Sequence, residues 1–519
     1  MNIQKYIIII FAMVNSFLVS SCNMPDASDL GKENIIPKPT LIKATGSKFT
    51  VSEETKIILG NNSKELEMVG EYFARLLRPA TGFKFELEHE NAEPSGNFLF
   101  DVTNKYPELG EEGYKLTITK NAVMLEANKT AGIFRGIQTI RQLFPLEIEK
   151  QTSQNIVWEL SSGTIVDYPN YEYRGAMLDV SRHFFEVDEV KQFIDWLARY
   201  KMNMLHMHLT DDQGWRIEIK KWPDLAKIGG STKVGGGPGG YFTQEQYKEL
   251  VDYAGKRFIT IIPEIDMPGH TNAALASYAE LNCDNIATDL YTGTEVGFSS
   301  LCIQKEVVYE FVDDVIGELA SLTPGPYIHI GGDESHSTEK NDYIHFIHKV
   351  QEIVSSHGKQ MIGWDEITLS RLKPGTIAQF WNSEENAKQA VNQGIKVIMS
   401  PASKSYLDMK YDSTTVLGLN WAGYIEVNTG YNWTPENLIP VVEKEDIIGI
   451  ECPLWTETIT NMNEMEYMVF PRLLGYAEIG WSQTENRNWE DYKIRLGKQT
   501  KRFKEMGINY YPSELINWQ

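Results

Sequence analysis

Asp333 and Glu334 are adjacent carboxylates that end a short apolar run, directly after the Gly331-Gly332 pair. Parallel strands of α/β barrels deliver catalytic side chains from that end, and two carboxylates in different surroundings can divide acid and base work. A solvated acidic turn is the commoner explanation of a bare Asp-Glu pair. Glycine weakens a strand and lets a ligand approach the backbone, so the preceding Gly-Gly pair favours a catalytic site.

Other apolar runs of the chain also end in side chains that could do chemistry. They are followed by Arg182, by Asp211, by Asp266 and His270, by Trp364, by Trp381, by Tyr406 and Asp408, and by Trp455 and Glu457. Singly, a Trp is more often core, and an Asp after a strand is more often a helix cap. Their concurrence at one face of one barrel indicates a site, because function lies at that face.

The composition of this set favours a sugar as the substrate. Aromatic rings stack on the apolar faces of a pyranose, and charged side chains bind its hydroxyl groups. A Gly-x-Ser-x-Gly nucleophile motif is missing from the ends of the apolar runs, which argues against a serine hydrolase of that type. Glycosidic chemistry by carboxylates is therefore the first hypothesis.

The elements that must position these side chains are eight apolar runs, each followed by a loop and a helical pattern. They lie at residues 175–180, 202–209, 258–265, 327–330, 360–364, 377–381, 396–399 and 447–452. Strands that alternate with helices predict a parallel sheet, and eight such units predict a (β/α)₈ TIM barrel over residues 170–519. An open doubly wound sheet is the alternative, but it should carry a G-x-G-x-x-G turn after its first strand. Gly175 starts that strand and no such turn follows.

Residues 41–169 predict a small α+β domain ahead of the barrel. Strand patterns at 56–60 and 114–119 are joined by a hairpin partner at 123–127. Helical spacing covers 64–77 and 131–144, with Pro145 ending the second helix. This domain contains no obvious chemical cluster.

The N-terminus predicts export. Lys5 precedes a mostly apolar stretch at 6–19, which is short for a membrane span and suits a signal peptide. Small residues before Cys22 resemble a bacterial lipoprotein cleavage site, so residues 1–22 predict a lipoprotein signal peptide; an ordinary secretory signal with an incidental Cys is the alternative. Polar residues 23–40 predict a tether. We expect a periplasmic, outer-membrane or cell-surface protein that meets the membrane only through a lipid on Cys22.

Charge and cysteine content narrow the partners further. A net charge of −22 argues against nucleic acid and against an anionic membrane surface. Export permits disulfides, and Cys283 and Cys302, which bracket a polar loop, could pair. Cys452 lies in an apolar run and is expected to be a buried thiol. The cysteine spacing does not suit a zinc site.

Residues 178–185, 205–215, 263–270 and 329–334 give the chain a clear family resemblance. It resembles the family 20 glycoside hydrolases, which are β-N-acetylhexosaminidases, and the resemblance extends through the small N-terminal domain. It implies an exo-acting enzyme that removes terminal β-linked GlcNAc or GalNAc from glycans with retention and without a cofactor. The nucleophile would be the substrate's own 2-acetamido oxygen, which forms an oxazolinium intermediate.

The resemblance also implies a role for each residue of the set. Glu334 would protonate the leaving oxygen and later activate water, while Asp333 would orient the acetamide and stabilise the oxazolinium ion. Tyr406 would bind the acetamido oxygen, and the pocket wall would be formed by Trp364, Trp381 and Trp455. The sugar hydroxyls would be bound by Arg182, Asp408 and Glu457. Asp211 and His270 would form a supporting network behind Glu334, and Asp266 would belong to an outer layer.

Two other functions stay open at this point. His206 and His208, with Asp211, Asp266 and His270, could bind the metal of a metal-dependent hydrolase. Alternatively, the two histidines point inward from one strand and fill the barrel, and the resemblance implies no metal. A non-catalytic glycan-binding surface lipoprotein is a third hypothesis, which would require the loss of Asp333 or Glu334.

Overall fold

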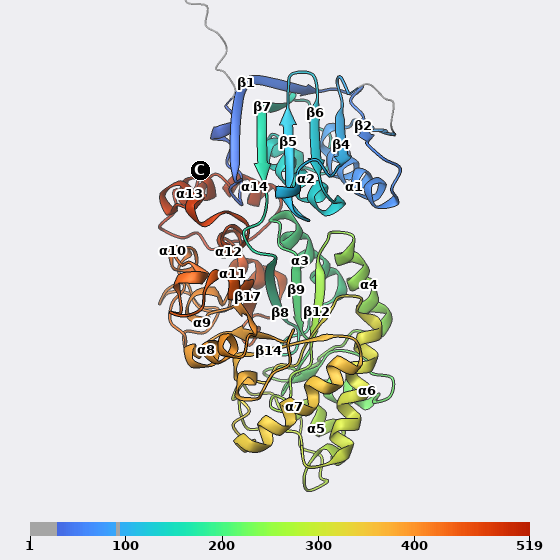
Figure 1. The fold of residues 1–519 in the computed structure, drawn as a ribbon, viewed down its shortest axis with the longest axis vertical. Coiled ribbons are helices and arrows are strands. Elements are labelled where there is room, and N and C mark those ends of the chain that lie inside the picture. The colour runs from blue at the N-terminus through green and yellow to red at the C-terminus, as the bar shows by residue number, and fades with distance from the viewer. Residues whose placement is uncertain (1–28, 90–93) are drawn as a thin grey trace, which may run out of the picture.

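The computed structural model describes residues 29–89 and 94–519, which form two domains stacked along the long axis (Figure 1). A mixed sheet with two helices forms one domain, and a closed barrel ringed by helices forms the other. The predicted signal peptide, Cys22 and residues 23–28 of the predicted tether lie outside the described residues. Within the described ranges, no helix is both long and apolar enough to cross a bilayer.

The N-terminal domain is built on a seven-stranded sheet with the order β1-β7-β5-β6-β4-β2-β3. Its strands are β1 (Leu41–Val51), β2 (Ile57–Leu59), β3 (Leu87–Glu88), β4 (Phe98–Val102), β5 (Tyr114–Ile118), β6 (Val123–Ala127) and β7 (Trp158–Asp167). β5 and β6 pair antiparallel, so the predicted hairpin is confirmed. The side chains of β5 alternate between buried and partly exposed, which is the pattern of a strand with one covered face.

Two helices cover this sheet. α1 (Lys64–Thr81) begins where the Ser63 side chain accepts the Leu66 N–H, and it ends at Gly82, whose φ of 73° is the usual glycine stop. α2 (Thr130–Leu143) packs between the sheet and the barrel, since its Arg135 donates to the Arg257 and Phe258 carbonyls of the barrel domain at 3.3 and 2.7 Å.

The second domain is a closed barrel of parallel strands. Its strands are β8 (Tyr173–Asp179), β9 (Met204–His208), β12 (Thr260–Glu264), β13 (Tyr327–His329), β14 (Gln360–Trp364), β15 (Ile377–Phe380), β16 (Lys396–Met399) and β17 (Ile447–Leu454). Parallel pairing of β17 with β8 closes the ring. The TIM barrel prediction is therefore confirmed, and the open doubly wound sheet is excluded.

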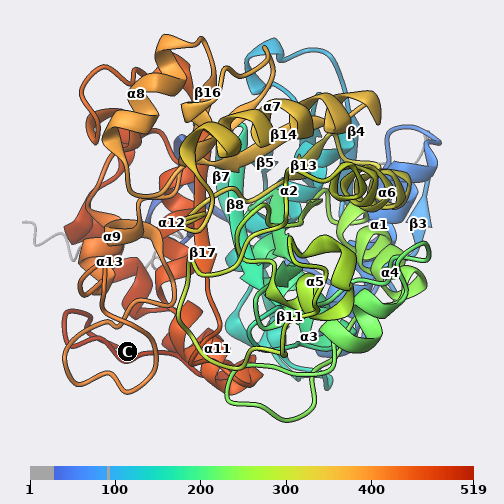
Figure 2. The same cartoon turned by 90° about the horizontal axis from the view of Figure 1, so that it is seen from below.

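Helices surround the barrel, as the view from below shows (Figure 2). The longer ones are α3 (Val187–Arg199), α4 (Gln244–Gly255), α6 (Glu306–Leu322), α7 (Lys340–Ser356) and α12 (Arg472–Trp481). Shorter elements are α5 (Asn272–Ser277), α8 (Glu384–Asn392), α9 (Ala402–Ser405), α10 (Val427–Tyr431), α11 (Met462–Val469), α13 (Trp489–Gly497), α14 (Thr500–Glu505) and the small pair β10 (Thr210–Asp211) and β11 (Gly214–Trp215).

The prediction that a helix follows every barrel strand is wrong for one connection. Between β14 and β15 the chain forms only a 3₁₀ helix, Asp365–Leu369. Pro374 and Gly375, whose φ is 91°, follow soon afterwards and leave no room for a longer helix before β15 begins.

The barrel interior has an apolar layer and a polar layer. Ile262, Ile362 and Ile398 pack together with Tyr173 in the apolar one. The polar one contains the fully buried residues His206, Glu264, His329, Gln379 and Glu451. Branched apolar residues are usual throughout such interiors, so this polar layer is unusual and indicates a functional role.

Residues 29–40 are packed, which corrects the tether prediction for that part. Leu30, Ile35 and Ile36 are buried between the domains. The Gln142 side chain accepts the Ile36 N–H at 3.0 Å and donates to its carbonyl at 2.8 Å. Because these few apolar side chains stand among polar neighbours, the composition of the segment predicted a tether, although the segment fills the junction between the domains.

Ion pairs also join the two domains. Glu112 of the N-terminal domain lies 2.8 Å from Arg135 Nε and 2.6 Å from Arg174 Nη2 of β8. Burial alone would raise the pKa of Glu112, but Arg174 and Arg135 lower it to about 2. Likewise Lys201 Nζ lies 2.8 Å from Asp167 Oδ2, with both side chains fully buried. Each buried charge at this junction has a partner of opposite sign.

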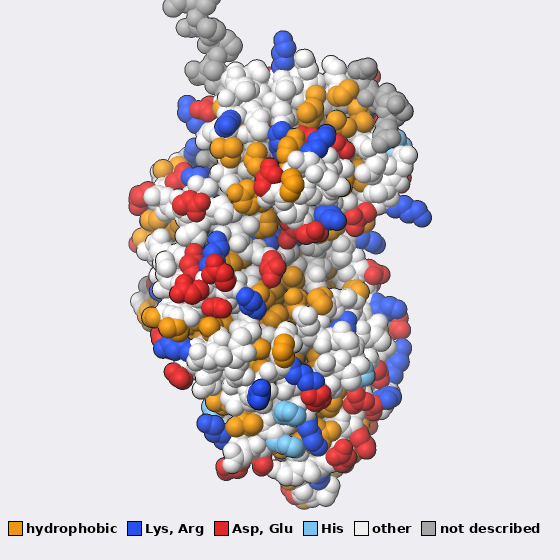
Figure 3. Space-filling model, viewed as in Figure 1, with side chains coloured by type: hydrophobic (Ala, Val, Ile, Leu, Met, Phe, Trp, Pro, Cys, Tyr) orange, Lys and Arg blue, Asp and Glu red, His pale blue; other side chains and the backbone are white. Residues whose placement is uncertain are grey.

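The cysteine predictions are confirmed. Cys283 and Cys302 form a disulfide that closes the loop after β12, and Cys452 is a buried free thiol. On the face in Figure 3, acidic and basic side chains are interspersed, so the negative net charge is not gathered in one patch there.

Candidate active site

The turn after β13 places Asp333 and Glu334 at the C-terminal end of the barrel. Gly331, Gly332 and Glu334 have positive φ values of 66°, 98° and 46°. A Cβ on Gly331 would lie 1.8 Å from Asp266 Oδ1, and the same oxygen accepts the Gly332 N–H at 3.0 Å. Glycine is thus required where the turn passes Asp266, and a non-glycine left-handed residue such as Glu334 marks a site held against strain.

A cavity of about 220 Å³ opens beside this turn. It is lined by Arg182, His270, Thr294, Val296, Asp333, Glu334, Trp381, Tyr406, Asp408, Leu419, Trp421, Trp455 and Glu457. A hollow of about 730 Å³ lies between α7 and α8, but it lacks such a convergence of carboxylates and aromatic rings. The smaller cavity is the site, and its size suits one sugar ring better than a large ligand.

Asp333 is a buried carboxyl that faces other acids. It is 8% exposed, and its Oδ1 has no hydrogen-bond partner among the described residues. Burial raises the pKa of Asp333 well above its ordinary value, and Asp266 raises it further, although His270, whose Nε2 lies 4.0 Å from Asp333 Oδ2, opposes the shift. The pKa of Asp266 is itself raised to about 7, chiefly by burial.

Glu334 is more open than Asp333, with 27% of its side chain exposed. His270 Nε2 lies 3.6 Å from Glu334 Oε2, and His270 Nδ1 lies 3.2 Å from Asp211 Oδ1. Burial would lower the pKa of His270, but Asp211 and Asp266 raise it well above the ordinary value. His270 is therefore an imidazolium that links Glu334 to Asp211, the network predicted behind the acid.

Arg182 is anchored from behind, which leaves its guanidinium fixed at the cavity wall. Its Nη2 lies 2.7 Å from Asp211 Oδ2, and its Nη1 lies 3.4 Å from Asp179 Oδ2. The guanidinium carbon lies 4.8 Å from the centre of a Trp455 ring. A planar donor held in this way can present fixed N–H groups to hydroxyl oxygens.

Aromatic rings form much of the cavity wall. Trp421 meets Trp381 and Tyr406 edge to face, with ring centroids 6.0 and 5.9 Å apart. The Trp381 indole donates to Glu366 Oε2 at 3.1 Å. Trp364 does not border the cavity: it is 1% exposed and packs behind Trp455 at 5.8 Å. It therefore supports the wall rather than forming its surface.

Three more carboxyls near the cavity resemble Asp333 in their electrostatics. Burial, together with Glu457, raises the pKa of Asp408 well above its ordinary value. The pKa of Glu457 is raised by burial, although Arg182 opposes this. Burial, with Asp365 and Asp333, raises the pKa of Glu366 in the same way. The cavity is thus surrounded by more buried acids than bases, and an added positive charge would relieve their repulsion.

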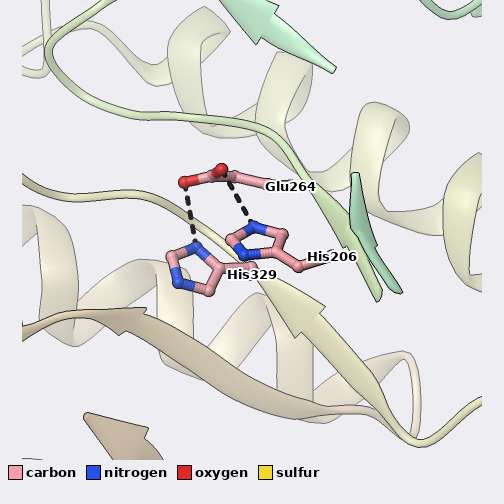
Figure 4. A group of neighbouring side chains, drawn as sticks. All are labelled: His206, Glu264 and His329. Carbon is pink, nitrogen blue, oxygen red and sulfur yellow. Dashed lines mark ion pairs between the residues drawn. The ribbon is translucent and has the colours of Figure 1, made fainter. Parts of the chain in front are cut away.

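The polar layer of the barrel lies directly beneath the site. Glu264 lies 2.9 Å from His206 Nε2 and 3.0 Å from His329 Nδ1, with the carboxylate beside both rings (Figure 4). The three residues bring ligand-type atoms within 4.8 Å of one another, as in a metal site. Burial would lower the pKa of His206, but Glu451 and Glu264 raise it to about 9. A protonated imidazole has no lone pair for a metal, so these contacts favour an ion-pair network.

The structure brings the predicted set together, with three members set back from the cavity. Asp211 and Trp364 lie behind the cavity, and the other predicted residues border it or, like Asp266, hold the catalytic turn. Sequence patterns gave no sign of four cavity residues from irregular loops, Thr294, Val296, Leu419 and Trp421. They also gave no role to Glu264 or Glu366, and the position of Glu366 after β14 was the only available signal for it.

Family comparisons agree with this geometry over both domains. Residues 171–484 match the model described as "Glycosyl hydrolase family 20, catalytic domain", and residues 32–168 match "Glycosyl hydrolase family 20, domain 2". A curated "Beta-N-acetylhexosaminidase" of Cellulomonas fimi is 38% identical over 506 residues, which cover 95% of this chain and 98% of that protein.

Solved structures are similar over nearly the whole chain. A GH20 β-N-acetylhexosaminidase from Streptomyces coelicolor A3(2) is 47% identical with a TM-score of 0.91, covering 94% of this chain and 99% of that one. A mutant Streptomyces plicatus β-hexosaminidase, in complex with the product GlcNAc, is 48% identical with a TM-score of 0.91, covering 94% and 98%.

Proposed function

The chain belongs to glycosyl hydrolase family 20 and is a β-N-acetylhexosaminidase, and we propose that it removes single terminal β-linked GlcNAc or GalNAc units from glycans by substrate-assisted catalysis. A cavity of about 220 Å³ supports an exo action on one sugar at a time. The product of the reaction would keep the β configuration.

One observation supports this mechanism above all: the surplus of buried carboxyls around the cavity. Asp333, Glu366 and Asp408 have raised pKa values because each is buried among other acids. Such a site is arranged in advance for a positive charge that the protein does not supply. An oxazolinium ion formed from the substrate's acetamido group would bring that charge next to Asp333.

The steps follow from the positions of the two carboxyls. Glu334 gives its proton to the leaving oxygen while the acetamido oxygen attacks C1, so the C1–O glycosidic bond breaks and the oxazolinium ring closes. Asp333 orients the acetamide N–H and balances the ring's charge, and Tyr406 donates to the acetamido oxygen. Glu334 then takes a proton from water, which attacks C1 and reopens the ring.

The remaining cavity residues hold the sugar in place. Arg182, Asp408 and Glu457 would bind ring hydroxyls, while Trp381 and Trp455 would pack against its apolar faces. His270 and Asp211 would keep Glu334 in position. Trp364 would back the acetamide wall from behind Trp455, and Asp266 would hold the catalytic turn.

The test compares two substrates that differ only at C2. A nitrophenyl β-glucoside with a 2-hydroxyl group should be essentially inert, while the 2-acetamido substrate is cleaved. A thiazoline that mimics the cyclised acetamide should inhibit strongly, since it resembles the intermediate. Trapping a covalent glycosyl-enzyme on Asp333 with a fluorosugar, or ready hydrolysis of the 2-hydroxy substrate, would return the site to an ordinary two-carboxylate scheme.

We also propose that the protein is an exported lipoprotein whose membrane contact is a lipid on Cys22. The support is the sequence alone: the basic start, the apolar stretch at 6–19 and the small residues before Cys22. Cys22→Ser should move the protein from the membrane fraction to the soluble fraction. An unchanged membrane fraction would contradict the lipid anchor and leave the enzymatic proposal intact.

A further inference from the structure

We propose that Glu264, buried in the barrel interior, is a positioning residue with two tasks. Its carboxylate holds Trp364, which supports the part of the cavity wall that we call the acetamide wall, and it also holds the network that supports the catalytic acid Glu334. This inference rests on the proposed function, because it assigns Glu264 to both halves of the substrate-assisted reaction. Glu264 is the last residue of β12 and touches no part of the cavity. It acts through the residues it binds.

One oxygen of Glu264 supports the acetamide wall. Its Oε1 accepts the Trp364 indole N–H at 3.0 Å. Trp364 packs behind Trp455, a cavity residue, with ring centroids 5.8 Å apart. The orientation of the Trp364 ring, and so the depth of the wall, depends on this hydrogen bond because no other polar contact of its indole is present in the described structure.

The same oxygen lies close to the catalytic turn. His329 Nδ1 accepts the Gly331 N–H at 3.0 Å and also lies 3.0 Å from Glu264 Oε1, a contact rather than a second hydrogen bond because this nitrogen is already an acceptor. Gly331 is the first residue of the left-handed turn that presents Asp333 and Glu334. One ring nitrogen therefore separates Glu264 from the backbone that carries the catalytic pair.

The second oxygen of Glu264 supports the acid through a chain of alternating imidazoles and carboxylates. Its Oε2 forms a short contact with His208 Nδ1, and His208 Nε2 lies 3.0 Å from Asp211 Oδ2. Asp211 in turn holds His270 at 3.2 Å and Arg182 at 2.7 Å. His270 ends the chain beside Glu334.

This chain of imidazoles and carboxylates is buried, and its members are charged. His208, Glu264 and Asp211 are at most 1% exposed. Burial opposes ionisation of each group, but the neighbours outweigh it: the pKa of Glu264 is held well below its ordinary value and that of His208 well above. In such surroundings a change at one link alters the geometry of the next, because water cannot screen it.

Glu451 offers a matched control from the same layer. Its carboxylate is fully buried and lies 2.9 Å from His206 Nδ1, while the Glu264 carboxylate lies 2.9 Å from Nε2 of the same ring. Its other partners are Tyr173 and Gln379, neither of which borders the cavity. Glu451→Gln therefore removes the same charge from the same histidine without touching Trp364, His329 or His208.

The experiment compares Glu264→Gln with Glu451→Gln, each measured per mole of folded enzyme. For Glu264→Gln we expect kcat/KM on the nitrophenyl 2-acetamido substrate to fall about 10²-fold, the scale of a misplaced catalytic group. The inhibition constant of the thiazoline should rise by a similar factor, because the intermediate and its analogue lose the same contacts. Glu451→Gln should stay within about threefold of wild type on both measures.

Equal kinetics for the two variants would overturn the proposal and leave a purely structural role for Glu264. If Glu264→Gln does not fold, Trp364→Phe, which removes the indole N–H and keeps a ring, decides: we expect about tenfold weaker thiazoline inhibition, and unchanged inhibition overturns the proposal. Wild-type enzyme that cannot cleave the 2-acetamido substrate would instead refute the proposed function itself, so the two failures are distinguishable.

Discussion

The junction between the domains and the catalytic cavity treat buried charge in opposite ways. At the junction, Glu112 lies between Arg135 and Arg174, and its pKa is lowered to about 2. At the cavity, Asp333 has His270 Nε2 no closer than 4.0 Å to its Oδ2, and burial among other acids raises the pKa values of Asp333 and Asp408 well above normal. Both regions bury acids, yet only one of them balances the charge within the protein.

The difference separates stability from function. A paired buried ion is strongly destabilising to break, because its partner is left alone in a low-dielectric interior. An unpaired buried carboxyl costs stability where it stands and persists when something else provides the counter-charge. At the cavity the substrate's oxazolinium ion is that counter-charge, so we expect mutations at the two regions to have opposite profiles of activity and stability.

The largest effect is expected for the acid at the cavity. Glu334→Gln removes the proton donor and keeps the shape, so turnover of natural glycosides should fall by up to about 10⁴-fold. The loss should be milder for nitrophenyl glycosides, whose leaving group needs no proton. Steady-state kinetics on both substrate types tests this, with Glu295→Gln, an exposed acid near the cavity, as the control. Equal losses on both substrates, with glycosylation rate-limiting, would contradict the acid role.

Glu112→Gln should show the profile of the junction. It leaves the fully buried side chains of Arg135 and Arg174 without their carboxylate, so the free energy of unfolding should fall by about 3–5 kcal/mol. Activity per mole of folded enzyme should be unchanged. Denaturant unfolding would measure the loss, and the neighbouring exposed Glu111→Gln should have little effect.

The pH dependence of that loss identifies its origin. A carboxyl whose pKa is lower in the folded chain stabilises it above the unfolded value, 4.5, and loses this effect as the pH falls towards about 2. The difference between wild type and Glu112→Gln should therefore shrink by about 2 kcal/mol from pH 7 to pH 3. A difference that is constant with pH would mean that packing, not charge, holds Glu112.

Asp333→Asn should give the reverse profile at the cavity. Turnover should fall by roughly 10²-fold, because the charge that stabilises the oxazolinium ion is gone while the side chain still fits. The unfolding temperature should be unchanged or higher, since an unpaired buried carboxyl has been neutralised. Thermal unfolding and kinetics on one preparation would test both. A marked loss of stability would show that Asp333 has a structural counter-charge.

Much of the fold could be predicted because the signals were local. The eight apolar runs overlap the eight barrel strands, since each strand is short, buried and followed by polar loop residues. The packing of residues 29–40 could not be predicted, because Leu30, Ile35 and Ile36 are buried by contacts with α2 and α13 that are distant in sequence.

The site could be predicted where its residues end strands and could not where they come from loops. The ends of parallel strands converge by geometry, so the sequence positions of Arg182, Asp333 and Trp381 are enough to assign them to one face of the barrel. Trp421 lies on an irregular loop and is 55% exposed, and its sequence neighbours carry no period that would aim it at the cavity. Glu264 ends β12 but does not border the cavity, and a carboxylate buried in the barrel interior is identified only by its partners on other strands.

Removal of metal ions should have the smallest effect of all. The candidate ligands His206, Glu264 and His329 resemble a metal site in spacing, but their contacts are those of an ion-pair layer. Both ring nitrogens of His206 lie 2.9 Å from carboxylate oxygens, and its pKa is raised to about 9, so near neutral pH both nitrogens carry a proton and neither offers a lone pair. Dialysis against EDTA should leave kcat/KM within experimental error. Loss of activity that zinc restores would show that the buried acids at the cavity are balanced by a metal, and the contrast with the junction would then disappear.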